Sequence, residues 1–483
     1  MKTPFRAEQL ASVALPLLAF AAPVFAKEAP EGPSQVSDIV VTAQRREAAL
    51  AATPLSLTVV AQPLLNDVGV RDIKDLQILT PGLIVASTSN QTFTTARIRG
   101  VGTVGDNPGL ESSVGVMIDG VYRPRNGVAL GDLGEVERIE VLKGPQATLF
   151  GKNTSAGVIN VVTAAPSFTP RLAGEATFGD YGTQGGSVSL TGPIVDEVLA
   201  GRLYVAARRR DGLYDVKTGD GPRTETDDQN EHYDTVRGQL LWRATPDLTA
   251  RLTADWTERD ERCCVGVQLV TGGTAPLLAT FAPDGGVAAT PNPWAHVAYS
   301  NRDTNTRIRD KGLALHLTAD LGWAQLDSTT AVRDWRGVIS QDWDFTSADL
   351  AYRPDDGSWS NRFRTLTQEV RLSGQRGRLD WSGGVFLADE KLTRRDSLFY
   401  GADYEAYVSR LLSRTGGNPL GDPTYVSTLT GLAVGQSFVE GQGQRDRYWQ
   451  TTQSAALFAQ ASYAVTDRLT LTGGLRRTHE TKA

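Results

Sequence analysis

The sequence predicts a membrane all-β fold, in which an α+β segment precedes an antiparallel transmembrane β-barrel. Three observations lead to this prediction. Apolar and polar residues alternate with a period of two from about residue 170 onward. After the first hairpin, short turns and long polar loops alternate strictly between those segments. After the first 26 residues, no stretch approaches the roughly 20 consecutive apolar residues of a spanning helix.

The first 26 residues have the layout of a secretory signal peptide. Lys2 and Arg6 give a positive start, Leu10–Phe20 is largely apolar, and Val24–Ala26 resembles a cleavage site with small residues. We therefore expect residues 1–26 to be removed on export and exclude them from the fold.

The composition argues against several function classes. A net charge of −6 and a pI near 5.5 give no electrostatic basis for binding nucleic acid. The four histidines are scattered at positions 232, 296, 316 and 479, so they form no metal-ligand motif. Gly144 and Gly151 lie too far apart for a phosphate-binding loop. We expect no enzyme, no cofactor and no resident metal.

The two cysteines, Cys263 and Cys264, are adjacent. They cannot form a disulfide framework, because a bridge between neighbours closes almost no loop. The favoured interpretation is two small residues in an exported loop. A bridge between them that stiffens this loop is the alternative.

The first folded segment is expected at residues 54–166, after a linker at 27–53. It combines many glycines with short apolar stretches, and one helical pattern lies near Val70 to Leu79. The apolar stretches predict strands at 55–60, 114–120, 136–144 and 158–163.

Residues 170–483 carry the alternation. In LTARLTADW at 248–256, Leu, Ala and Trp residues fall on one side, and Thr, Arg and Asp residues fall on the other. Eleven strands are expected, at 171–178, 184–192, 201–210, 235–244, 248–258, 311–319, 323–335, 364–373, 378–389, 453–464 and 469–480.

Connection lengths distinguish a membrane barrel from a soluble sandwich with the same alternation. The long polar loops are 211–234, 259–310, 336–363 and 390–452, and the short turns that alternate with them include 245–247, 374–377 and 465–468. Outer-membrane barrels sort their loops in this way, with short turns on one rim and long loops on the other. Lipid offers no hydrogen-bond partner, so a sheet that spans it needs paired edges.

Several stretches resemble the TonB-dependent outer-membrane receptors. They are DIVVTA at 38–43, TPGLIV at 80–85, RIRGVG at 97–102, VGVMIDGVY at 114–122 and LGDLGEVERIEVLKGPQATLFGKNTSAGVINVVTAAP at 130–166. The resemblance covers the chain from about residue 38 to its end. It implies that residues 54–166 form a plug domain inside the barrel.

The resemblance also implies that DIVVTA is a TonB box, which pairs with the periplasmic energy-coupling protein TonB. β-branched residues in this stretch favour an extended backbone, and an extended segment can add itself to the edge of a partner sheet. The implied TonB-binding residues are Asp38, Ile39, Val40, Val41, Thr42 and Ala43.

By the same resemblance, the protein is an importer in the outer membrane of a Gram-negative type of cell, surrounded by lipid and driven by TonB. Its ligand would be a small molecule such as a metal chelate, with ferric siderophore first and cobalamin, haem or oligosaccharide as alternatives. Ligand-binding candidates in the upper plug loops are Arg99, Asp106, Asn107, Tyr122, Arg123 and Arg125. Contacts between plug and barrel wall are the alternative role for these side chains.

The chain departs from the family in its strand number. The family barrel has about 22 strands, and eleven are expected here. The chain also ends at Ala483, without the terminal aromatic residue of the family. We therefore expect either a fragment of a longer importer or a truncated remnant that does not transport.

Overall fold

The computed structural model describes residues 40–41, 48–49, 55–88, 90–105, 107–125, 127, 133–282 and 292–483. Within these ranges, no helix is both long enough and apolar enough to cross a bilayer.

The plug contains a five-stranded sheet in which β10 and β7 are parallel and the other neighbours are antiparallel. Its order is β3 (Leu57–Ala61), β9 (Val136–Lys143), β10 (Gly157–Thr163), β7 (Val114–Ile118) and β8 (Val121–Arg123). The four strands predicted in this segment are confirmed. A smaller sheet, not predicted, joins β4 (Leu83–Ser87), β5 (Thr94–Ile98) and β6 (Val101–Gly102). Fully buried Ile139, Ile159 and Val114 lie in the core of the plug.

The helix predicted near residues 70–79 is wrong. The α-helix lies earlier, as α2 (Gln62–Val68), and only a 3₁₀ turn, η2 (Asp75–Ile78), forms in the predicted range. Gly69 ends α2 in the left-handed conformation, with φ of 73°. The Asp75 carboxylate then accepts hydrogen bonds from the backbone N–H groups of Arg71 and Asp72, at 3.1 and 3.0 Å. Together with the bond from the Lys74 N–H to Asp72, these bonds satisfy backbone donors at the start of η2, which stays separate from α2.

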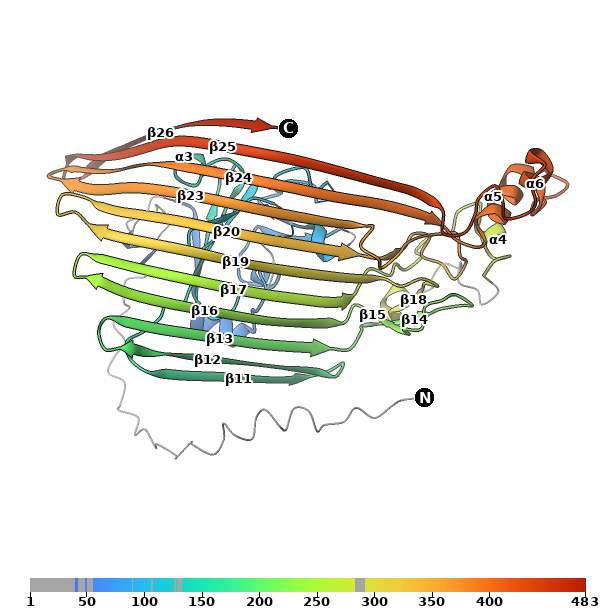
Figure 1. Cartoon of the computed structure of the whole chain (residues 1–483), viewed down its shortest axis with the longest axis horizontal. Coiled ribbons are helices and arrows are strands. Elements are labelled where there is room, and N and C mark those ends of the chain that lie inside the picture. Colours follow the sequence, from blue (N-terminus) through green and yellow to red (C-terminus); the bar gives the residue numbers. More distant parts are fainter. Residues whose placement is uncertain are drawn as a thin grey trace, which may run out of the picture.

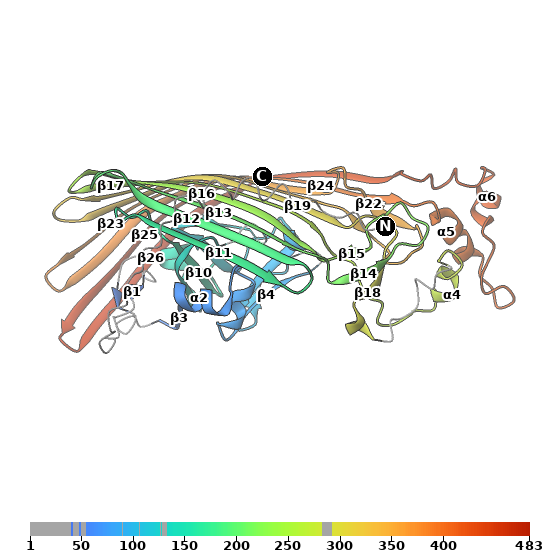
Figure 2. The same cartoon turned by 90° about the horizontal axis from the view of Figure 1, so that it is seen from below.

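The eleven predicted barrel strands are confirmed, and they form one continuous antiparallel sheet (Figure 1). They are β11 (Arg171–Gly179), β12 (Thr183–Val195), β13 (Leu199–Arg210), β16 (Glu231–Thr245), β17 (Leu248–Arg262), β19 (Asn305–Asp320), β20 (Gln325–Ile339), β23 (Ser360–Arg376), β24 (Leu379–Tyr400), β25 (Gly443–Thr466) and β26 (Leu469–Lys482). The sheet arches over the plug, which lies in its concave side (Figure 2).

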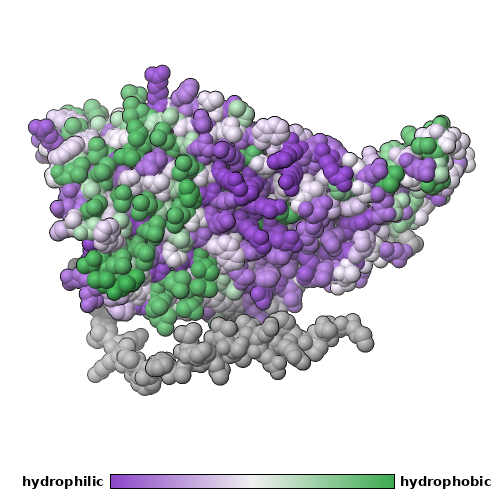
Figure 3. Space-filling model, in the orientation of Figure 1, coloured by the Kyte–Doolittle hydropathy of each residue, from purple (hydrophilic) through white to green (hydrophobic). Residues whose placement is uncertain are grey.

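The convex face of this sheet is apolar. Leu203, Leu240 and Leu313 point outward and are exposed, whereas Gln239 and Thr253 point inward and are buried. Apolar residues gather as a band over the half of the sheet nearest the short turns (Figure 3). A soluble sandwich would bury this face, so the side-chain orientation is that of a membrane barrel.

The outer parts of the strands extend further than predicted. Residues 390–452 were expected to be one long loop, but β24 continues to Tyr400 and β25 begins at Gly443. Beyond the apolar band both faces meet water, so the alternation that predicts strands fades.

Additional elements fold at the long-loop rim (Figure 1). They are the strands β14 (Tyr214–Lys217), β15 (Asp227–Asp228), β18 (Val297–Tyr299), β21 (Gln341–Asp342) and β22 (Ala351–Arg353), and the helices α4 (Ala275–Leu278), α5 (Tyr404–Ser413) and α6 (Tyr425–Thr430).

Candidate functional site

Three plug loops meet at the end of the plug that faces the long-loop rim. The first contains the 3₁₀ turn η3 (Gln91–Phe93), the second contains Gly109, and the third contains Arg125 and Gly127. The Gly127 N–H donates to the Thr94 carbonyl at 2.9 Å, and Arg125 donates to the Gly109 carbonyl at 2.8 Å. The sequence places these loops about 15 to 35 residues apart, and these bonds bring them together at one apex.

Local chemistry fixes the first loop against the wall. Asn90 caps η3, because its side-chain oxygen accepts a hydrogen bond from the Thr92 N–H at 2.9 Å. The Phe93 ring lies 6.2 Å from that of Trp359. Gln91, the first residue of η3, is half-buried.

A cavity of about 520 Å³ lies between this apex and the wall. Plug residues form one side and the outer ends of strands β13, β16 and β17 form the other, together with the loop around Phe345. The described lining is Ser87, Thr88, Asn90, Gln91, Arg210, Gln229, Asn230, Glu231, Glu261, Arg262, Cys263, Cys264, Val265, Gly266, Gln341 and Phe345. Its volume is within the usual range for a small-molecule site.

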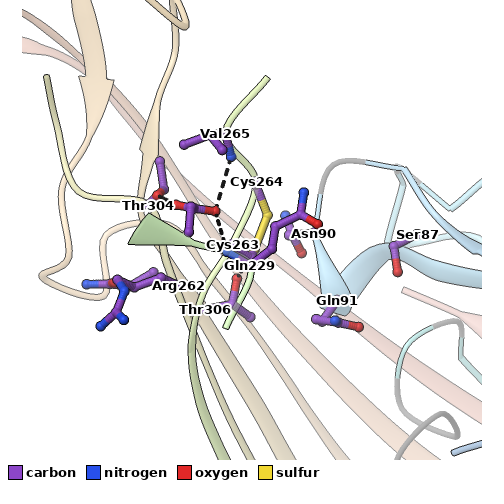
Figure 4. The surroundings of a disulfide bond; sticks show 12 residues. Ser87, Asn90, Gln91, Gln229, Arg262, Cys263, Cys264, Val265, Thr304 and Thr306 are labelled. Atoms are coloured by element: carbon purple, nitrogen blue, oxygen red, sulfur yellow. Dashed lines mark hydrogen bonds between the residues drawn. A yellow bond between two sulfur atoms is a disulfide. The ribbon is translucent and has the colours of Figure 1, made fainter. Parts of the chain in front are cut away.

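Cys263 and Cys264 form a disulfide with each other. The favoured interpretation of two unbridged residues is therefore wrong, and the alternative of a bridge is confirmed. The Cys263 N–H donates to the Thr304 carbonyl at 2.7 Å, and the Cys263 sulfur lies 2.9 Å from the Thr306 hydroxyl. The bridge faces Asn90 and Gln91 of the plug across the cavity (Figure 4).

Buried acids hold the loops that form the cavity wall. Asp228 accepts hydrogen bonds from the N–H groups of Gln229, at 2.9 Å, and Val265, at 3.4 Å. Burial raises the pKa of Asp228, although Thr304 and Arg223 oppose that shift. Burial likewise raises the pKa of Asp344, beside Phe345, to about 6.

The predicted residue Arg125 joins the plug to the wall. Its side chain is buried, its Nε donates to Glu390 at 2.8 Å, and its Nη2 donates to Gln450 at 3.1 Å. Asn107 shapes the neighbouring loop, because its side-chain oxygen accepts a hydrogen bond from the Gly109 N–H at 2.8 Å. These contacts agree with the structural alternative considered from the sequence.

Tyr122 and Arg123 lie deeper in the barrel. Asn153 donates to the Tyr122 hydroxyl at 2.6 Å, and a guanidinium nitrogen of Arg123 lies 4.0 Å from the Asp310 carboxylate. Arg99 follows β5, at the end of that strand that is farther from the apex. There it donates to the Ser56 hydroxyl at 2.8 Å. Asp106 is outside the described residues. None of the five described candidates lines the cavity, and their contact with ligand stays a prediction.

Part of the predicted TonB box is described. Val40–Val41 forms β1, which pairs antiparallel with β2 (Ala48–Ala49). Val41 is buried in a cluster that includes Met117 and Phe458. Asp38, Ile39, Thr42 and Ala43 are outside the described residues.

Sequence reasoning missed most of the cavity lining. Gln91, Gln229 and Gln341 come from segments far apart in the chain, and nothing in their local sequence marks them. The adjacent cysteines were the one available signal, because they lie directly after β17. Over the same described ranges, no group of three His, Cys, Asp or Glu side chains is placed to hold a metal ion.

Comparison with known proteins gives the family. A family model, the TonB-dependent Receptor Plug Domain, matches residues 49–158. The pesticin receptor of Yersinia pestis is 34% identical over 216 residues, which is 44% of this chain and 30% of that protein. This chain belongs to the TonB-dependent receptors. A second relative, the ferric enterobactin receptor PirA of Pseudomonas aeruginosa, is 33% identical over 137 residues, 26% of this chain and 18% of that protein.

Solved structures support the fold of this TonB-dependent receptor. The crystal structure of the ferric yersiniabactin uptake receptor FyuA from Yersinia pestis matches with a TM-score of 0.67 at 20% identity. That match covers 89% of this chain and 57% of the other. The receptor thus spans little more than half of that structure, and it matches 30% of the pesticin receptor. The relatives are receptors rather than enzymes, as the sequence predicts.

Proposed function

We propose that this TonB-dependent receptor takes up a small iron chelate across the outer membrane. The observation that carries the proposal is the cavity of about 520 Å³ between the plug apex and the wall. Two relatives support the choice of cargo, because their names state ferric enterobactin and ferric yersiniabactin. The signal peptide at residues 1–26 and the apolar band of the sheet support placement in the outer membrane.

Energy coupling would act through residues 38–43. An extended segment with β-branched residues is suited to pair with the edge of a partner sheet. For TonB to pair with this segment, Val41 must first leave the cluster in which it is buried beside Tyr122 and Leu149. A pull on the segment would therefore act directly on side chains of the plug.

The coupling is tested by capture of the receptor on the purified periplasmic domain of TonB. Val40→Pro removes a backbone N–H and should abolish capture, whereas Val40→Thr keeps a β-branched residue and should be captured as the parent is. Equal capture of both variants would show that strand pairing at residue 40 is not the contact.

Uptake is tested with radiolabelled ferric chelates in iron-starved cells that express the receptor. We expect accumulation that disappears when TonB is deleted and when Val40→Pro is introduced. Accumulation that survives both changes would contradict an energy-coupled importer.

A further inference from the structure

The charges around the cavity are already neutralised by one another. Its described lining contains two arginines and two glutamates. Arg210 lies 3.2 Å from Glu231, and Arg262 lies 2.8 Å from Asp227 just behind the lining. The other glutamate, Glu261, lies 3.7 Å from Arg259, which also bonds to Asp72 at 2.7 Å. On the described walls, a charged ligand would therefore meet charges that already lie beside an opposite charge, and it would have to leave its own hydration behind.

The remaining polar groups of the lining are neutral hydrogen-bonding groups. Carboxamides dominate, and a carboxamide has both donors and an acceptor. The oxygens of Asn90 and Asn230 already accept the N–H groups of Thr92 and Arg262, at 2.9 and 2.6 Å. They come from the plug through Gln91, from the wall through Gln229 and Asn230, and from the rim through Gln341. Such groups match hydroxyl and amide groups, which also both donate and accept hydrogen bonds. They match hydroxamate groups of a neutral chelate as well, because these carry no full charge.

One wall of the cavity is apolar and rigid. It is formed by the Cys263–Cys264 disulfide, Val265 and Phe345. A side chain at Gly266 would lie about 3.2 Å from the Phe345 ring, so this glycine leaves space for the ring. The two bridged sulfurs have no free rotamers to lose when a ligand binds, and sulfur packs well against apolar surfaces.

Three residues with strained backbone conformations line the same cavity. Nine described residues other than glycine have positive φ, and three of them line this cavity, namely Gln229, Cys264 and Phe345, with φ of 60°, 88° and 55°. Such conformations cost free energy and persist where the surrounding structure imposes them, which is common at ligand sites.

We propose that the cavity selects an uncharged ligand that is rich in hydroxyl or amide groups and has one apolar face, which lies on the Cys263–Cys264 disulfide. This inference rests on the proposed function for the direction of transport, but it concerns the chemistry of the ligand. Two sources have this chemistry: a neutral ferric trihydroxamate and an oligosaccharide. A polyanionic tris-catecholate chelate does not have it.

The test measures binding of three probes to the detergent-purified receptor by titration calorimetry. Ferrichrome is the neutral trihydroxamate, maltohexaose is the oligosaccharide, and ferric enterobactin is the anionic tris-catecholate. We expect a neutral probe to bind at least tenfold more tightly than ferric enterobactin. Tighter binding of ferric enterobactin, or binding of none of the three, would overturn the inference.

The probes also separate this inference from the proposed function. Binding of maltohexaose alone would support the cavity chemistry and contradict an iron chelate as cargo. Binding of ferric enterobactin alone would support iron uptake and contradict the cavity chemistry. Binding of ferrichrome would support both the cavity chemistry and an iron chelate as cargo.

The role of the disulfide is tested with the double variant Cys263→Ala and Cys264→Ala. It should weaken binding of the neutral probe about tenfold, because the rigid wall is lost. Phe345→Ala is a second variant that leaves the bridge intact and should also weaken binding. Trp294→Ala is the matched control, since this side chain is 83% exposed and lies outside the cavity lining. Unchanged affinity in both wall variants would show that the ligand does not rest on this wall.

Discussion

Arg125 shows how a single residue holds the plug in the barrel. Its guanidinium is buried and donates to Glu390 of β24 and to the Gly109 carbonyl of the plug. A buried ion pair contributes little beyond an apolar substitute, but removing one partner leaves an uncompensated buried charge. When Arg125 is lost, the carboxylate of Glu390 therefore stays buried without its partner, and this lowers the free energy of unfolding.

We expect Arg125→Ala to reduce the free energy of unfolding by about 3–5 kcal/mol, as measured by chemical denaturation in detergent. Arg309→Ala is the control, because Arg309 bonds to Glu258 at 2.7 Å but is 63% exposed. A surface pair of that kind is worth at most about 1 kcal/mol. Similar losses in both variants would contradict the buried-anchor role.

The loop that carries Phe345 depends on Asp344, which accepts hydrogen bonds from the N–H groups of Leu350 and Ala351, both at 3.3 Å. Burial raises the pKa of Asp344 from 3.8 to about 6. Burial also raises the pKa of its neighbour Asp342. A raised pKa in the folded state means that the folded loop binds protons more tightly than the unfolded chain.

The loop should therefore be most stable below the ordinary Asp pKa and lose stability as the pH rises through about 6. We expect amide exchange in residues 341–351, corrected for its intrinsic rate, to reveal more opening at about pH 8 than at about pH 5. Residues 139–142 of the plug core serve as an internal reference. Equal protection of the loop at both pH values would contradict the raised pKa of Asp344.

At the scale of elements, Gly157 determines how β10 pairs with β9. Its φ is 153°, and a Cβ at this position would lie 2.2 Å from the Leu142 carbonyl oxygen, a backbone atom of the neighbouring strand. The backbone can relieve that overlap only by moving the strands apart. The plug sheet therefore requires glycine at this position.

Gly157→Ala should destabilise the plug by more than about 2 kcal/mol, measured as a lower denaturation midpoint and faster proteolysis of the plug. Gly144→Ala is the matched control, because Gly144 also has positive φ, 102°, but has open space around its missing Cβ. Its cost should be limited to backbone strain of about 1 kcal/mol. Equal effects of the two substitutions would show that crowding against Leu142 is unimportant.

Element prediction succeeded where one physical constraint dominates. Along the apolar band, lipid lies on one side of the sheet and a wet lumen on the other, so apolar and polar residues alternate with a period of two. This alternation predicts all eleven strands. In the plug, Gly69 ends α2, and the Asp75 side chain bonds to the backbone at the start of η2; a hydrophobic pattern encodes neither contact. At the outer rim, α5 depends on Glu405, which accepts hydrogen bonds from Gly435, Ser437 and Phe438 more than 25 residues away.

At the scale of the whole molecule, the outward apolar face is the property that assigns the sheet to a bilayer. Leu240 lies on this face and is 41% exposed. Leu240→Arg should cost roughly 2–4 kcal/mol of stability in the membrane. We expect less heat-resistant, folded protein in the outer-membrane fraction.

Trp449→Arg is the control for this prediction. Trp449 is 72% exposed near the outer end of β25, well beyond the apolar band, so arginine there should be tolerated. If Leu240→Arg inserted as well as Trp449→Arg, the face around Leu240 would not be in contact with lipid.

The barrel strands, the plug strands and the family can all be predicted from the amino-acid sequence, because each depends on a local pattern or a contiguous motif. The position and the lining of the cavity depend on the tertiary fold. Gln91, Gln229 and Gln341 meet because the plug sits inside an arched sheet, and no short-range pattern records that meeting. The tertiary structure also showed that Arg125 bonds to Glu390 of the wall, because a guanidinium bonds to whichever carboxylate the fold places beside it.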